Sequence, residues 1–84
     1  MVNKRSPSPL KKVFGLNIRL ERIRQNLTQE ELAHRIGRDQ SYVSQIESAS
    51  IAASLDVVDQ FAKALAVTPV SLFDATFGRG ATPQ

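Results

Sequence analysis

The feature that most constrains the fold is a glycine between two short stretches with helical periodicity. Gly37 separates these stretches, and only two or three residues around it join one to the other. Glycine adopts a positive φ without steric cost, so it can end one helix and redirect the chain at once. Two helices that are joined so closely must cross steeply instead of lying side by side. The sequence therefore predicts a tight helix pair centred on Gly37.

Both helices of this pair have clear start signals. Thr28, followed three residues later by Glu31, predicts a capping box in which each side chain bonds the backbone N–H of the other residue. Asp39 is a suitable N-cap for the second helix, which we expect from Gln40 to about Glu47. A steep crossing also requires a small residue and apolar anchors on the inner faces, and these are Ala33, Val43 and Ile46. Together these features define a helix-turn-helix.

The segment before the pair is apolar on two sides of a predicted helix. From Val13 onward, one stripe of apolar residues recurs at intervals of three and four residues. Phe14 and Ile18 lie on a different face of the same helix. A helix that is apolar on two sides is expected to be central, with several neighbouring helices. The members of the stripe are Val13, Leu16, Leu20, Ile23 and Leu27.

Two further helices are expected after the pair. Ser54 is a suitable N-cap for a fourth helix, and Thr68 followed by Pro69 predicts a short fifth helix, because proline is tolerated in the first helical turn. The apolar residues of these two segments are Leu55, Val58, Phe61, Ala62, Leu65, Val70, Leu72 and Phe73. Since no alternating strand pattern occurs along the chain, the expected fold class is all-α with five short helices.

The two ends differ in composition from the helical body. Residues 1–12 contain two prolines, no acidic residue and the basic residues Lys4, Arg5, Lys11 and Lys12, as is typical of a flexible basic arm. The chain has 11 Lys and Arg against 8 Asp and Glu, so seven basic and eight acidic residues remain after the arm. The positive charge therefore belongs to the arm. We expect a domain over residues 13–74 and a tail over residues 75–84.

Composition also excludes several classes of function. The chain has no cysteine, so it forms no disulfide or zinc-thiolate site, and its single histidine, His34, has no second ligand at metal spacing. We therefore expect no metal and no cofactor. No nucleophile and base pair or glycine-rich phosphate loop is present, so we expect neither an enzyme nor a small-molecule site. Without a membrane-length apolar run or a signal peptide, a cytoplasmic protein that does not contact membranes is expected.

These motifs resemble the Cro/C1-type (XRE-like) helix-turn-helix family of bacterial and phage regulators. The resemblance extends from about Phe14 to Phe73 and rests on Ile18-Arg19, Arg22, Leu27 to Ala33, Gly37, Ser41 to Glu47, Ser54-Leu55 and Ala64 to Val67. It implies a lambda-repressor-like domain of five helices that binds a palindromic operator in double-stranded DNA, usually as a dimer. The run Asp-x-x-Tyr-x-Ser that starts at Asp39 further resembles small stand-alone controllers of restriction–modification systems and phage repressors.

The third helix has the chemistry that this resemblance requires. Its outward positions are polar and uncharged, and glutamine can pair with adenine while serine can donate or accept. The N-terminus of the second helix attracts a phosphate through its free N–H groups and the helix dipole. The alternative is that these are ordinary solvated residues, and for Tyr42 that it packs on the helix surface. The expected base contacts are Gln40, Ser41, Ser44 and Gln45, and the expected phosphate contacts are Thr28, Gln29, Arg38 and Tyr42.

The resemblance also implies an internal ion pair between Arg22 and Glu47, which would set the angle of the third helix. One such helix contacts too few base pairs for useful specificity, so a homodimer is expected. Its expected interface residues, for which core packing is the alternative, are Val67, Val70, Leu72, Phe73 and Phe77.

Two alternatives remain open at this point. The basic arm either adds salt-dependent contacts with DNA or is only a solubilising end. The protein as a whole is expected to be a transcription regulator, either a repressor or an autoregulatory controller. The alternative is an antitoxin-like module that binds DNA together with a partner protein, because a fold does not determine function.

Overall fold

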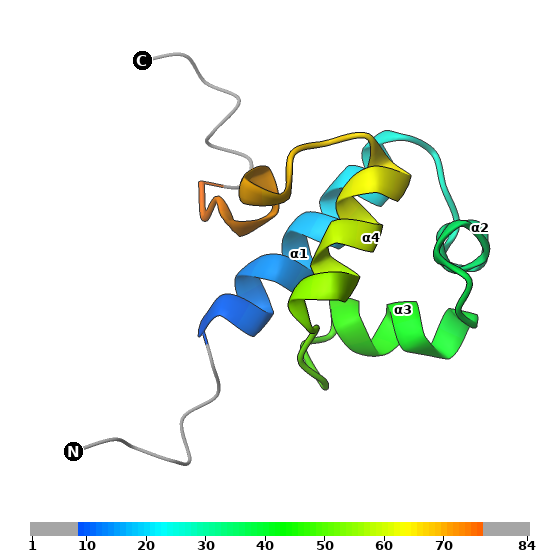
Figure 1. Ribbon diagram of the computed structural model, residues 1–84, viewed down its shortest axis with the longest axis horizontal. Helices are drawn as coiled ribbons and strands as arrows, with labels where there is room; N and C mark the ends of the chain where they lie inside the picture. The colour runs from blue at the N-terminus through cyan, green and yellow to red at the C-terminus, as the bar shows by residue number, and fades with distance from the viewer. Residues whose placement is uncertain (1–8, 77–84) are drawn as a thin grey trace.

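The computed structural model describes residues 9–76, which form four α-helices and one 3-10 helix (Figure 1). The helices are α1 (Pro9–Arg24), α2 (Gln29–Ile36), α3 (Gln40–Glu47), α4 (Leu55–Leu65) and η1 (Pro69–Phe73). Strands are absent from the described part of the chain, so the predicted all-α class is confirmed. The expected fifth helix is a five-residue 3-10 helix, a form common in such short pieces. Between residues 9 and 76, no helix has both the length and the apolar character to cross a membrane.

The α2–α3 pair has the ends that its sequence predicts. Glu31 N–H donates to Thr28 Oγ1 at 3.0 Å, and Thr28 N–H donates to Glu31 Oε1 at 2.8 Å, which completes the capping box. Gly37, with a φ of 72°, ends α2 in the left-handed conformation. In Figure 1, α2 is seen end-on while α3 runs across the view, so the two helices cross steeply. Their inner faces bury Leu32, Ala33, Val43 and Ile46.

α1 begins earlier than the composition predicted. It starts at Pro9, so residues 9–12, which we expected in the arm, are helical. Proline is tolerated in a first turn because its missing N–H would have no helical partner there, and leucine and lysine favour helix formation. The expected boundary at residue 12 is therefore wrong. Residues 1–8 of the arm and residues 77–84 of the tail, including Phe77, lie outside the described residues.

Aromatic contacts join α1 to the C-terminal half of the domain. The ring of Phe14 meets that of Phe61 edge-on at 5.8 Å and stacks on that of Phe73 at 5.2 Å between centroids. Leu55, although at helical spacing with the core residues of α4, is 82% exposed. The buried apolar residues are Phe14, Ile18, Leu32, Ala33, Val43, Ile46, Val57, Val58, Phe61, Ala62, Leu65 and Leu72.

Only one of the two apolar faces of α1 is covered. Phe14 and Ile18 are buried on that face. α3 lies so close that a Cβ at Gly15 would overlap the carbonyl oxygen of Ile46. The other face remains accessible, with Leu16 at 38%, Leu20 at 41% and Ile23 at 50% exposure. α1 does contact several neighbours, α3, α4 and η1, as expected of a central helix, but they leave the side with Leu16, Leu20 and Ile23 accessible.

Candidate nucleic-acid interface

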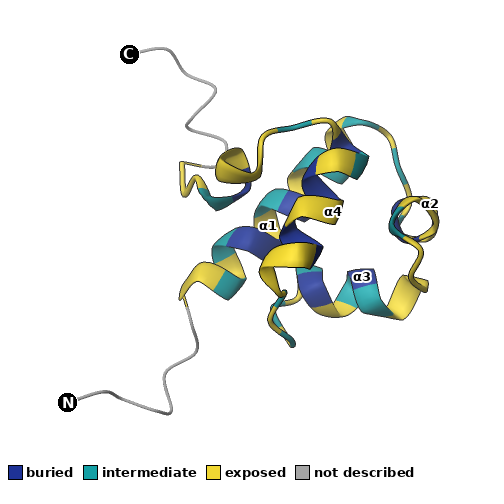
Figure 2. Cartoon of the chain, viewed as in Figure 1, coloured by how far each residue is buried: buried dark blue, intermediate teal, exposed yellow. Residues whose placement is uncertain are grey.

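α3 presents its polar side to solvent. Of the four expected base-contacting residues, Gln40, Ser41 and Gln45 are exposed and Ser44 is half-buried. Figure 2 shows the exposed N-terminal end of α3 in yellow, next to the turn that follows α2. Because the opposite side of α3 is buried in the core, the helix is held from behind and its polar face is free for a ligand.

Asp39 fixes the first turn of α3. Its Oδ1 accepts the Tyr42 N–H at 3.1 Å and the Ser41 hydroxyl at 2.9 Å. These bonds, with that from the Ser41 side chain the strongest influence, lower the pKa of Asp39 below its ordinary value of 3.8, so the carboxylate is charged at neutral pH. Ser41 has therefore committed its hydroxyl hydrogen, and its oxygen remains available as an acceptor.

A chain of hydrogen bonds runs from the exposed end of α3 to its last residue. Gln40 Nε2 donates to Gln29 Oε1 at 3.0 Å, and Gln29 Nε2 donates to Glu47 Oε1 at 3.0 Å. Glu47 in turn accepts from Arg22 Nε at 2.6 Å and from Arg22 Nη2 at 3.0 Å. Gln29, the first residue of α2, thus connects both ends of α3 with α1.

The expected ion pair between Arg22 and Glu47 is present, and it is largely buried. The two side chains are only 12% and 4% exposed. Arg22 also donates from Nη1 to the carbonyl oxygen of Leu27 at 2.8 Å, so the guanidinium has several partners. A bidentate arginine–carboxylate pair fixes orientation as well as charge. Its role here is to hold α3 against α1.

The two linked glutamines still have hydrogen-bonding capacity. A glutamine amide offers two N–H donors and a carbonyl oxygen with two lone pairs. Gln40 uses one N–H within the chain of bonds, so it keeps one N–H and its oxygen. That donor and acceptor match N7 and N6 of adenine. Gln29 keeps one N–H at the N-terminus of α2, where the helix dipole favours an anion.

Arg38 and Tyr42 lie together where α3 begins. The Arg38 guanidinium carbon is 4.2 Å from the centroid of the half-buried Tyr42 ring, a cation–π contact that the sequence did not predict. Thr28, at the start of α2, uses its side-chain oxygen to accept the Glu31 N–H, which leaves its hydroxyl hydrogen free to donate. The expected phosphate-contacting groups therefore lie at the starts of the two helices of the pair.

Sequence reasoning missed two features that position α3. One is Gly15, whose lack of a side chain allows α3 to approach α1, and whose signal was a glycine inside a helical pattern. The other is the bond from Gln29 to Glu47. No local pattern could have predicted this bond, because the two residues are 18 positions apart and lie on different helices.

The residues expected at a dimer interface have different surroundings. Leu72 is 2% exposed and belongs to the core, which corrects the expectation that it faces a partner. Phe73 and Val67 are half-buried and pack against the core. Val70 is 79% exposed. The structure therefore leaves Val70 as the accessible member among the described residues of this set.

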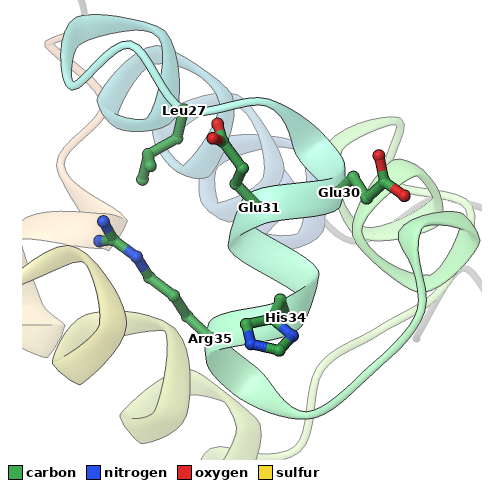
Figure 3. Close-up of a pocket in the computed structure, with 5 residues that line it drawn as sticks. All are labelled: Leu27, Glu30, Glu31, His34 and Arg35. Carbon is green, nitrogen blue, oxygen red and sulfur yellow. The ribbon is translucent and has the colours of Figure 1, made fainter.

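A separate open pocket lies over α2, lined by Leu27, Glu30, Glu31, His34 and Arg35 (Figure 3). The close-up shows Glu30 pointing to one side of the helix and Glu31 and Arg35 to the other, and, in addition to hydrogen bonding with Thr28, the Arg35 charge helps to lower the pKa of Glu31. Across residues 9–76, no three His, Cys, Asp or Glu side chains gather as they would around a metal ion. This pocket therefore adds no candidate catalytic or metal site.

Comparison with known proteins agrees with this geometry. The sequence profile of the helix-turn-helix family matches residues 18–72. Control protein C.BamHI of Bacillus amyloliquefaciens is 37% identical over 65 residues, which cover 76% of this chain and 80% of that protein. The fold and the site define a helix-turn-helix protein of the DNA-binding class. More particularly, the chain belongs to the Cro/C1-type helix-turn-helix family.

Solved structures show the same architecture. The hypothetical transcription factor NHTF from Neisseria superposes with a TM-score of 0.80 at 30% identity, over 96% of this chain and 93% of that one. The restriction-modification controller protein C.Esp1396I was crystallised as a tetramer with its natural 35 base-pair operator. It superposes with a TM-score of 0.72 at 30% identity, over 79% of this chain and 87% of that one.

Proposed function

We propose that the protein is a sequence-specific DNA-binding transcription regulator that contacts its operator through α3. The observation that carries this proposal is the chain of bonds from the buried Arg22–Glu47 pair through Gln29 to Gln40. It holds the Gln40 amide in place at the exposed end of α3 before any ligand is present. Since ordering a free side chain costs binding energy, this arrangement favours affinity and specificity.

The proposal assigns distinct tasks to the two groups of residues. Gln40, Ser41, Ser44 and Gln45 contact base edges in the major groove, and these two amides and two hydroxyls suit a pattern of donors and acceptors. Contacts with the phosphate backbone come from Thr28, Gln29, Arg38 and Tyr42. Backbone contacts fix the register of the protein on the duplex, whereas base contacts carry the sequence preference.

The relatives favour a small controller that works as an oligomer. C.BamHI is named a control protein, and C.Esp1396I is a restriction-modification controller bound to its operator as a tetramer. For this chain we propose a homodimer, which would place two α3 helices about 34 Å apart on successive turns of a palindrome. Val70, at 79% exposure, and Leu55, at 82%, are the most exposed large apolar side chains described and the proposed contacts.

Selection of bound fragments from random DNA, followed by affinity measurements on the selected site, tests this proposal. Replacing Gln45 with alanine should cost about 1–3 kcal/mol on the selected site and relax the base preference at one position. The matched control is Gln60→Ala, an exposed glutamine on α4, which should leave both quantities unchanged. Equal loss on selected and random DNA for Gln45→Ala would exclude base contact.

Gln29 provides a second test, because we propose that it contacts a backbone phosphate and because its side-chain oxygen accepts the hydrogen bond that holds the Gln40 amide. Gln29→Ala should weaken binding to every sequence through the lost backbone contact. Since it also releases the Gln40 amide, it should additionally reduce preference at the position that Gln40 contacts. A Gln29→Ala and Gln40→Ala double-mutant cycle measures this coupling, and strictly additive effects would show that the bond between them has no role in binding.

A further inference from the structure

The exposed apolar stripe of α1 has a heptad spacing. Its four members within the helix, Val13, Leu16, Leu20 and Ile23, are separated by three, four and three residues, which places them alternately at the a and d positions of a coiled coil. Leu16, Leu20 and Ile23 are 38–50% exposed, and Val13 is half-buried. Leu27, which continued the stripe in the sequence, lies beyond the end of α1 and packs against the core. Single exposed apolar residues are ordinary, but a contiguous row marks an interaction site. We call Leu16, Leu20 and Ile23 the α1 seam.

The positions beside the seam carry positive charge. In the heptad register, Lys12 and Arg19 occupy g positions, and Asn17 and Arg24 occupy e positions. Lys12 and Arg19 are exposed, and 69% of the Arg24 side chain is exposed although it pairs with Glu21. Asn17 donates to backbone carbonyl oxygens near the chain's described C-terminal end. None of these four flanking positions is acidic.

We propose that the α1 seam docks an amphipathic helix of another protein, with apolar residues at its own a and d positions and acidic residues beside them. Charges at the e and g positions decide which helices pair. A second copy of this chain would place Arg19 and Arg24 opposite the same cations, which disfavours self-association through the seam. Glutamate or aspartate at the flanking positions of a partner would instead complement them.

The location of the seam makes this docking compatible with DNA binding. Successive residues of an α-helix turn by roughly 100°, so the seam lies on the side of α1 opposite Phe14 and Ile18. Those two residues face the core, where α1 also packs against α3. A helix on the seam therefore leaves the polar face of α3 uncovered. This function goes beyond operator binding and adds a contact through which the regulator recruits or responds to a protein.

A designed peptide probe tests the proposal on the full chain. The probe is a synthetic helix of about three heptads with leucine at a and d and glutamate at e and g, and its control has lysine at e and g. Fluorescence anisotropy should show that the acidic peptide binds at least about tenfold more tightly than the basic one. Leu20→Ser should weaken binding of the acidic peptide about tenfold, because burying a leucine side chain in the interface contributes at least that factor to the affinity. Gln60→Ala, which changes an exposed residue of α4 away from the seam, should not change this affinity.

A charge exchange separates docking from a merely structural effect. Arg19→Glu removes no core contact, since Arg19 is exposed, so the domain should fold as before. The variant should bind the acidic peptide about fivefold more weakly and the basic peptide about fivefold more tightly, because the flanking charge has changed sign. Operator affinity, measured separately, should stay the same in Arg19→Glu and Leu20→Ser. Gln45→Ala tests the proposed function alone: its effect on operator binding carries no information on docking at the seam.

Several outcomes would overturn the proposal. Equal affinity for the two peptides would exclude docking on the seam. So would an affinity for the acidic peptide that Leu20→Ser leaves unchanged. If sedimentation showed that Leu20→Ser converts a dimer into a monomer, the seam would be covered by a second copy instead. If anionic lipid vesicles bound in a Leu20-dependent way while the acidic peptide did not, the partner would be a membrane surface.

Discussion

The α2–α3 pair and α1 are both amphipathic, but their sequences specify them to different degrees. In the pair, the buried residues are the apolar ones at core spacing, and capping side chains and Gly37 mark where the helices begin and turn. In α1 there are two apolar faces, and the one with the longer regular stripe is the exposed one. The comparison teaches that periodicity identifies a helix but does not decide which of two apolar faces is buried.

The largest expected effect comes from comparing two ion pairs that involve α1. One joins Arg22 of α1 to Glu47 of α3, and the other, between Arg24 and Glu21, lies on the surface of α1. Glu47→Ala should lower the free energy of unfolding by about 3–5 kcal/mol, because it leaves the buried Arg22 guanidinium without its carboxylate. Glu21→Ala, which removes the partner of the exposed Arg24, should cost at most about 1 kcal/mol. Urea unfolding of both variants measures the difference. Similar losses would mean that the junction between α1 and α3 does not depend on its buried charges.

The next effect compares two neighbouring residues on different faces of α1. Gly15→Ala should destabilise the domain by about 2 kcal/mol, because the new methyl group meets the backbone carbonyl of Ile46, which cannot move without shifting α3. Leu16→Ala should cost less than about 1 kcal/mol, since that side chain is 38% exposed. Thermal unfolding at matched conditions checks both. A larger loss for Leu16→Ala would show that the seam is buried in solution.

A smaller effect concerns the helix ends. Gly37 and Ala66 both have positive φ, 72° and 58°. A Cβ at Gly37 would meet nothing within 4 Å, so Gly37→Ala should cost about 1 kcal/mol through backbone strain alone. Ala66→Gly should relieve the corresponding strain and stabilise the domain by roughly 0.5 kcal/mol. If both substitutions shifted unfolding in the same direction, backbone strain would not be the cause.

The smallest expected effect is a pH dependence at the start of α2. Hydrogen bonding to Thr28, first through its backbone N–H, lowers the pKa of Glu31 below its ordinary value of 4.5. A lowered folded-state pKa gives stability that is complete above 4.5 and lost as the pH falls through the folded-state value. As the pH is lowered over this acidic range, the free energy of unfolding should therefore fall less steeply in Glu31→Gln than in the unmodified protein. An unchanged slope would show that the capping box does not hold the carboxylate in solution.

Much of the interface could be predicted because it rests on local signals. The capping box at Thr28, the turn at Gly37 and the N-cap at Asp39 each depend on residues within a few positions. The start of α1 differs from the sequence prediction because prolines and lysines are common in flexible arms, yet Pro9 is also compatible with a first helical turn. The burial of Leu72 could not be foreseen either, since a short apolar segment suits a core and an interface equally.

By itself, the sequence determined the helical class, the steep pair around Gly37 and the polar outer side of α3, because hydrogen bonds and steric preferences between near neighbours specify them. Only the tertiary structure decided which face of α1 is buried and how Gln29 and Glu47 join two helices into one support for Gln40. These outcomes depend on the distance between helices distant in sequence. That distance is set by the space at Gly15 and by the packing of the whole core.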